Sequence, residues 1–158
     1  MFQKFIDEAI DVFRELPGHV GCDSRLLSEL ENEHGGEFPP IYRELMLLDS
    51  KRLTNMKFFV SPEQIRQTRS EAEHVIEFEE FELELKRNQC VFAWEYIDAF
   101  YYFEMVGDDN VPVWGVNYCG GFNVDGYVRG TPLKISDNIP EIFAKTIRSY
   151  LKLSLIHI

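Results

Sequence analysis

Hydrophobic residues recur every three or four positions through the first sixteen residues, which is the spacing of one face of an α-helix. The repeat stops before Pro17-Gly18, so the sequence predicts an amphipathic first helix that ends there. Its polar face is mostly acidic. The apolar positions are Phe2, Phe5, Ile6, Ala9, Ile10, Phe13 and Leu16.

Two further helices are predicted before residue 57. Asp23-Ser24 can cap a second helix, which Gly35-Gly36 ends because glycine adopts the left-handed conformation found after helices. A short third helix follows Pro39-Pro40. The inward positions are Leu26, Leu27 and Leu30 in the second helix, and Tyr42, Leu45 and Met46 in the third.

A fourth helix is predicted from Ser61, preceded by a short strand at 57–60. Ser61 supplies the cap, Pro62 the first helical position, and Gln64 the third residue of a capping box. A closing helix is predicted after Asp137-Asn138. Its apolar positions are Ile142, Phe143, Ile147, Tyr150 and Leu151.

From Cys90 onward the pattern favours β-structure, because β-branched and aromatic residues dominate. Turns are expected at 107–110 and 120–121. Pro112 lacks an amide hydrogen, so its strand is an edge or begins irregularly there. The predicted strands are Val91 to Trp94, Ile97 to Val106, Val111 to Tyr118 and Phe122 to Val128.

These elements predict an α+β fold, with helices packed on one face of an antiparallel β-meander and a closing C-terminal helix. A chain of 158 residues suits one domain, which we expect to span residues 1–152. Residues 153–158 resemble the translation of a transposon end used in sequencing libraries. We expect a non-native tail there, the alternative being an ordinary apolar terminus.

The chain is acidic, with a formal net charge of -11, which disfavours nucleic acid and anionic lipid as ligands. Three cysteines without a C-x-x-C pair indicate neither a disulfide framework nor a zinc ribbon, so we expect a reduced, cytoplasmic protein. The sequence shows no signal peptide and no run of about 20 apolar residues, so no membrane association is expected.

No catalytic, metal or cofactor site is expected. Residues 108–110 lack the alternating carboxylates of an EF-hand and indicate a turn. The histidines lack a second pair of zinc ligands, and Cys90 and Cys119 lack a local histidine base. The glycines at 120, 121 and 126 do not form a nucleotide-binding motif.

Residues 71–84 contain seven glutamates and no lysine or arginine. This run is either a solvated face or a docking surface for a cationic partner. The apolar residues within it favour a buried helical stripe, the alternative being an exposed set. They are Ile76, Phe78, Phe81, Leu83 and Leu85.

Two blocks of the chain, spanning about residues 20–150, resemble the SUKH superfamily of immunity proteins and yeast cell-wall-synthesis regulators. The first is GCDSRLLSELENEHGGEFPPIYRELMLL, with Gly21 before a helix and a proline-then-aromatic helix at Pro40 and Tyr42. The second is VFAWEYIDAFYYFEMVGDDNVPVWGVNY, similar to the family's aromatic hairpin with an acidic turn. The chain departs from the family at 48–51 and 96–98, where a glycine is usual.

The resemblance implies a non-enzymatic protein that binds and neutralises a cognate bacterial toxin domain, commonly a nuclease or deaminase. An acidic inhibitor suits a basic toxin, because opposite charge steers encounter and aromatic anchors then hold the complex. The alternative is a regulatory or scaffold protein of the same fold, and an enzyme is the third possibility. The expected steering residues are Glu77, Glu79, Glu80, Asp108 and Asp109, and the expected contact residues are Trp94, Tyr101, Tyr102 and Trp114.

Overall fold

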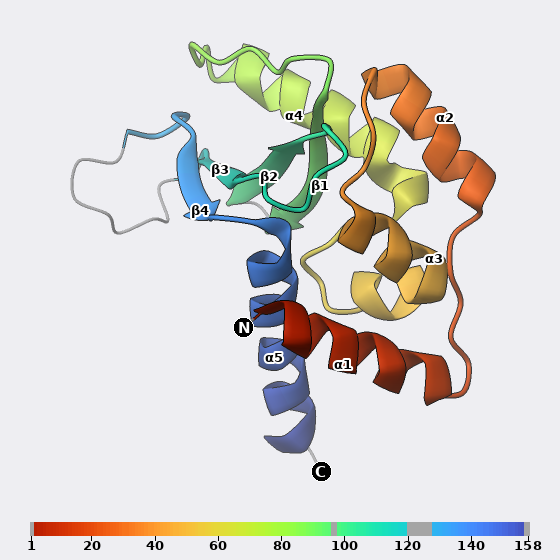
Figure 1. Cartoon of the computed structure of the whole chain (residues 1–158). Coiled ribbons are helices and arrows are strands. Elements are labelled where there is room, and N and C mark those ends of the chain that lie inside the picture. The colour runs from red at the N-terminus through yellow and green to blue at the C-terminus, as the bar shows by residue number, and fades with distance from the viewer. Residues whose placement is uncertain (1, 96–97, 120–127, 157–158) are drawn as a thin grey trace.

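Helices surround a four-stranded antiparallel sheet in the computed structural model, which describes residues 2–95, 98–119 and 128–156 (Figure 1). The sheet order is β1-β2-β3-β4, a meander. The predicted α+β class is therefore confirmed. The helices are α1 (Phe2–Glu15), α2 (Ser24–His34), α3 (Pro40–Thr54), the short 3₁₀ helix η1 (Pro62–Gln64), α4 (Ile65–Phe78) and α5 (Ile139–Ile156); the strands are β1 (Gln89–Glu95), β2 (Ala99–Glu104), β3 (Val113–Asn117) and β4 (Leu133–Ser136).

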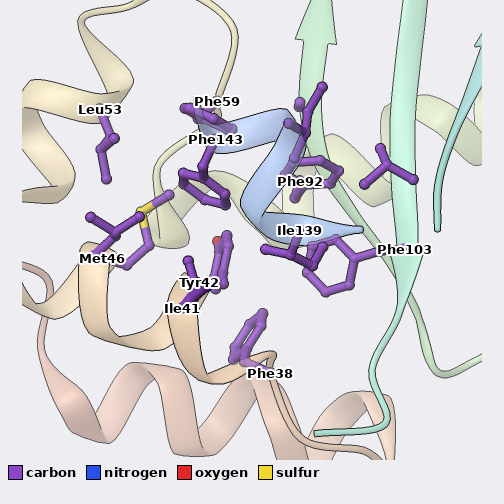
Figure 2. Packing of buried hydrophobic residues seen from close by; sticks show 14 of the residues in the cluster. Phe38, Ile41, Tyr42, Met46, Leu53, Phe59, Phe92, Phe103, Ile139 and Phe143 are labelled. Atoms are coloured by element: carbon purple, nitrogen blue, oxygen red, sulfur yellow. The ribbon is translucent and has the colours of Figure 1, made fainter. Parts of the chain in front are cut away.

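The main core lies between the sheet and helices α1, α2, α3 and α5. Tyr42 of α3 sits at its centre, with ring centroids 4.6 Å from Phe38, 5.7 Å from Phe103 and 6.2 Å from Phe143 (Figure 2). These elements meet because the inward faces of α3 and α5 and alternate residues of β1 and β2 are all apolar. Burial of this set gives the fold most of its stability.

The expectation that only one face of the sheet is covered is wrong. Side chains of β1 and β2 alternate between two clusters, and α4 covers the second face through Ala72 and Ile76. Figure 1 shows α4 at the top, far from α1 and the lower half of α5. The buried sheet residues of this second cluster are Val91, Phe100, Tyr102 and Val116.

The helix signals in the first half are mostly confirmed. Asp23 caps α2 by accepting a hydrogen bond from the Arg25 amide at 2.8 Å, and Gly35 ends it with φ 67°. Gly21 is required for close approach, because an added Cβ would lie 1.6 Å from the Leu47 carbonyl oxygen. In contrast, Ser61 makes no side-chain capping bond.

Helix α3 is longer than the short helix expected, and it is broken at Asp49, where φ is −158°. Asp49 is 1 % exposed, and its carboxylate accepts hydrogen bonds from the Val20 amide at 3.3 Å and from Arg52 Nε at 2.7 Å. A buried carboxylate with these partners replaces the missing helical bonds at the break. It also ties the loop before α2 to α3.

The second half differs more from the sequence prediction. At 57–60 only an isolated bridge forms, between Phe59 and Ala93. Strand β4 was not predicted, and the predicted strand from Phe122 lies mostly outside the described residues. Leu151 was expected to face inward but is 45 % exposed, at the edge of a cavity that it lines together with residues of α1.

No helix within the described ranges has the length and apolar content needed to cross a bilayer.

Candidate protein-binding surface

Helix α4 ends at Phe78 because the backbone turns back at Glu80. The Glu80 amide donates to Glu77 O at 3.2 Å, and the Phe81 amide donates to Ile76 O at 3.0 Å. This pair of bonds is a Schellman motif, which needs a left-handed residue at the turn. Glu80 has φ 56°, so a glutamate occupies a position that usually belongs to glycine.

Most of the predicted acidic run is exposed on α4 and the segment after it. We call the exposed members of residues 71–84 the acidic surface; they are Glu71, Glu73, Glu77, Phe78, Glu80, Glu82 and Glu84, together with His74. Glu73 pairs with Arg69 at 2.9 Å. Among the described residues, no lysine or arginine lies within ion-pair distance of Glu77, Glu80, Glu82 or Glu84.

Glu79 plays a different part from its neighbours. It is half-buried and forms an ion pair with Arg129 at 2.9 Å. The same guanidinium donates to the Tyr118 carbonyl oxygen at 2.7 Å and lies 5.4 Å from the Phe81 ring centroid. Glu79 therefore anchors the end of α4 to the end of β3, and its charge is compensated.

Phe78 is the residue that the sequence interpretation misplaced. It is 75 % exposed, the largest exposed fraction among the large hydrophobic residues described, whereas Ile76, Leu83 and Leu85 pack in the second cluster as expected. Helical phase explains the difference: Ala72 and Ile76 are four residues apart, and Phe78 falls on another side. Its ring stacks on exposed His74, with centroids 6.2 Å apart.

The two tryptophans lie on the sheet face that α4 covers. Trp94 and Trp114 are both half-buried and pack against the second cluster. Trp94 Nε1 donates to the Tyr118 hydroxyl at 3.0 Å, and the Trp94 ring borders a cavity of about 190 Å³ beside Glu71 of α4. The tryptophans and the acidic surface therefore belong to the same side of the molecule.

The two tyrosines are not available for contact. Tyr101 points into the main core, is 3 % exposed, and donates its hydroxyl to Glu95 at 2.7 Å. Tyr102 points to the opposite face but is 4 % exposed, because the second cluster covers it. Burial also raises the pKa of the Tyr102 hydroxyl. Both faces of β2 are covered, so neither side chain forms part of the molecular surface.

The acidic turn at residues 108–110 belongs to the connection between β2 and β3 and not to α4. Asp108 is exposed and accepts from the Asn110 amide at 2.9 Å. Asp109 joins two helices: its carboxylate accepts from the Ile41 amide at 2.9 Å, and its carbonyl oxygen accepts from the Ile139 amide at 2.9 Å. Burial, and secondarily Asp108, raise the Asp109 pKa. Asp109 thus caps the start of α3, a structural role that the sequence did not indicate.

The chemistry of the remaining groups offers no reactive centre on this surface. Burial raises the pKa of Cys22 to about 11 and that of Cys90 to about 12, so both are thiols at neutral pH. Cys119 is exposed. In the described part of the chain no three histidine, cysteine, aspartate or glutamate side chains are grouped as metal ligands would be.

No protein-family model, no curated protein and no solved structure matches this chain in the comparisons. The acidic surface and the aromatic residues near it are therefore the features of this chain that bear on its function.

Proposed function

We propose that this chain is an immunity protein of the SUKH type, which neutralises a cognate bacterial toxin domain by forming a direct complex with it. The observation that carries the proposal is Phe78, an aromatic ring 75 % exposed within a surface of glutamates, four of which have no cationic partner among the described residues. Aromatic residues are enriched at protein interfaces, where a few of them carry much of the binding energy. The protein acts without catalysis, cofactor or metal.

The partner is a basic protein. Four glutamates without ion pairs give the end of α4 a negative potential, which attracts a positively charged surface and speeds encounter. A toxin that cleaves or modifies nucleic acid presents such a surface, since it must bind phosphate. Once the partners meet, Phe78 enters an apolar pocket and displaces water, while the glutamates form the polar rim.

The test is co-expression with the toxin-like domain encoded beside this gene, scored by cell survival and by co-elution on a sizing column. Survival with a stoichiometric complex supports the proposal. Killing without a complex contradicts it for that toxin. A growth phenotype on loss of this protein in cells without any toxin, together with capture of host proteins by the same surface, would favour the regulatory scaffold instead.

Variants separate anchoring from steering. Phe78→Ala should weaken the complex about 10- to 100-fold, mainly by faster dissociation. Its control is Val12→Ala on α1, which removes another exposed apolar side chain, 54 % exposed. Equal effects of the two substitutions would remove Phe78 from the interface.

The charge test uses a double reversal, Glu77→Lys with Glu80→Lys. It should slow association and reduce its salt dependence while leaving the fold intact, because both side chains are exposed. The control reverses Asp7 and Asp11 on α1, which changes the net charge equally at the other end of the molecule. Equal slowing by both pairs would show that net charge matters and the position of the glutamates does not.

A further inference from the structure

A cavity of about 400 Å³ lies where the end of α2, the first turns of α4 and the segment before β1 meet. Three arginines line it against a single carboxylate, which is unusual in a chain with 27 acidic and 16 basic residues. Its size falls within the range of small-ligand sites. The lining residues are Glu33, His34, Arg66, Arg69, Leu85 and Arg87.

His34 lines this cavity and carries a buried hydrogen-bond acceptor without a partner among the described residues. The side chain is 5 % exposed, and its Nδ1 lies 2.7 Å from the Leu30 carbonyl oxygen. A carbonyl oxygen can only accept, so Nδ1 carries the proton and Nε2 has a free lone pair. Nε2 is buried and has no hydrogen-bond partner among the described residues.

The electrostatics keep this ring neutral. Burial lowers the pKa of His34, and the charges of Arg69 and Arg87 lower it further, against the opposing effects of the Leu30 bond and Glu33. A buried acceptor without a donor carries a desolvation penalty unless a ligand or water supplies one. A ligand in this cavity is therefore expected to carry a group that donates a hydrogen bond to His34 Nε2.

Two of the arginines also have structural duties. Arg87 donates to the carbonyl oxygens of Asn32 and Glu33, both at 2.9 Å, at the end of α2. Arg69 donates to the Gln89 carbonyl oxygen at 2.6 Å and pairs with Glu73. Carbonyl groups satisfy donors without cancelling charge, so Arg87 remains a cation with no carboxylate partner among the described residues.

Arg66 is the most accessible cation of the cavity. Its side chain is 50 % exposed and pairs with Glu33 at 2.7 Å and Glu29 at 3.4 Å. No bond from its Nη1 is found among the described residues, nor from Nη1 of Arg87. Two guanidinium groups can thus offer further donors to an anion while keeping their present bonds.

We propose that this cavity binds a small soluble anion bearing a phosphate group, with Arg66 and Arg87 donating to phosphate oxygens and His34 Nε2 accepting from a protonated one. Phosphate fits better than a carboxylate or sulfate because it alone combines negative oxygens with an O–H near neutral pH; the second pKa of a phosphate ester is about 6. This site is separate from the acidic surface and independent of the toxin partner.

The test is a titration of the full chain at about pH 6.5 with inorganic phosphate, a small phosphate monoester and sulfate, followed by calorimetry and by NMR of arginine Nε–H and histidine ring signals. Phosphate should bind more tightly than about 1 mM and shift the signals of Arg66, Arg87 and His34. It should be preferred over sulfate about tenfold or more, the value of one hydrogen bond to a charged group. Stronger binding of the monoester than of inorganic phosphate identifies an organic phosphate as the ligand, and the reverse identifies the free ion.

Variants test the assigned roles. Arg66→Gln should weaken phosphate about tenfold, and His34→Gln should abolish the preference over sulfate. The control is Arg25→Gln in α2, an exposed arginine outside the cavity. If His34→Gln does not fold, the comparison of phosphate with sulfate in the unaltered chain tests the proposal. Equal affinity for phosphate and sulfate would overturn it, and so would NMR shifts confined to residues outside the cavity.

Discussion

Glu80→Gly should stabilise the protein, although it removes a whole side chain. Glu80 has φ 56° at the turn that ends α4, and the two backbone bonds of the turn depend on that conformation. For residues with a Cβ the left-handed region costs about 1–2 kcal/mol, whereas glycine adopts it freely. Glycine also gains entropy in the unfolded chain, so the expected net gain is about 1 kcal/mol.

Two matched variants isolate this backbone effect. Glu80→Ala removes the same charge but keeps the Cβ, so the difference between the glycine and alanine variants measures the cost of the left-handed conformation minus the extra entropy of glycine in the unfolded chain. Glu77→Gly removes the same charge from inside α4, where glycine should destabilise by roughly 0.5–1 kcal/mol. Opposite signs for glycine at two glutamates three residues apart would be hard to explain by charge.

Urea denaturation followed by circular dichroism gives the free energies of unfolding, with thermal unfolding as a second measurement. A gain of 1 kcal/mol should raise the Tm by about 2–4 °C in a domain of this size. If Glu80→Gly is no more stable than Glu80→Ala, the strain argument is refuted, and the turn does not have the conformation described.

Three further results are expected. Tyr42→Phe should raise the free energy of unfolding by about 1 kcal/mol, because the Tyr42 hydroxyl is buried with no partner in the described part of the chain. Tyr101→Phe should lower the free energy of unfolding by about 1 kcal/mol, because it removes the hydrogen bond to Glu95. The free energy of unfolding should fall as pH drops below about 6.5, because the folded state lowers the pKa of His34 and so binds fewer protons than the unfolded state. In urea titrations His34→Gln should reduce this dependence of the unfolding free energy on pH. An unchanged pH dependence would contradict the attribution to His34. A thiol reagent should label Cys119 alone in the native protein and all three cysteines in urea, as read by mass spectrometry; native labelling of either buried thiol would contradict the packing.

The first half of the fold could be predicted from sequence because its signals are local. The spacing from Phe2 to Leu16 defines both the length and the buried face of α1. Asp23 and Gly35 define the ends of α2 by capping, which depends only on neighbouring residues. Pro112 was expected to lie in an edge strand or at an irregular strand start, and β3 begins at Val113, two residues after the predicted start at Val111. Each of these features acts within one or two turns of chain.

The second half depended on tertiary packing, and there the sequence was insufficient. Tyr101 and Tyr102 were both expected as contact residues, but they point to opposite faces of β2; the main core buries Tyr101, and the second cluster under α4 buries Tyr102. Leu133–Ser136 is short and partly polar, and it becomes a strand only because β3 offers an open edge. The structural role of Asp109 was missed for a similar reason, since its partner Ile41 lies 68 residues away in the chain.

For the candidate site, composition located the acidic run but could not place its apolar members. The stripe through Ala72 and Ile76 was recognisable, and strict helical phase would have put Phe78 outside it. Helical phase places Phe78 outside the stripe only if α4 continues without a break to that residue. The sequence supplied no helix stop there, because Glu80 stands where glycine would have marked the end.

The end of α4 departs from a stable design in three independent ways within eight residues. Glu73 and Glu77 are like charges four residues apart, Phe78 is exposed to water, and Glu80 is left-handed. Each of these features lowers the stability of the fold slightly. Several destabilising features that occur together are typical of functional sites. Glu80→Gly should therefore stabilise the chain yet slow its association with a basic toxin, because it removes the strain together with one of the four unpaired charges. A variant that gains stability and binds unchanged would show that Glu80 has no part in recognition, and would leave Phe78 and the other unpaired glutamates to support the interface.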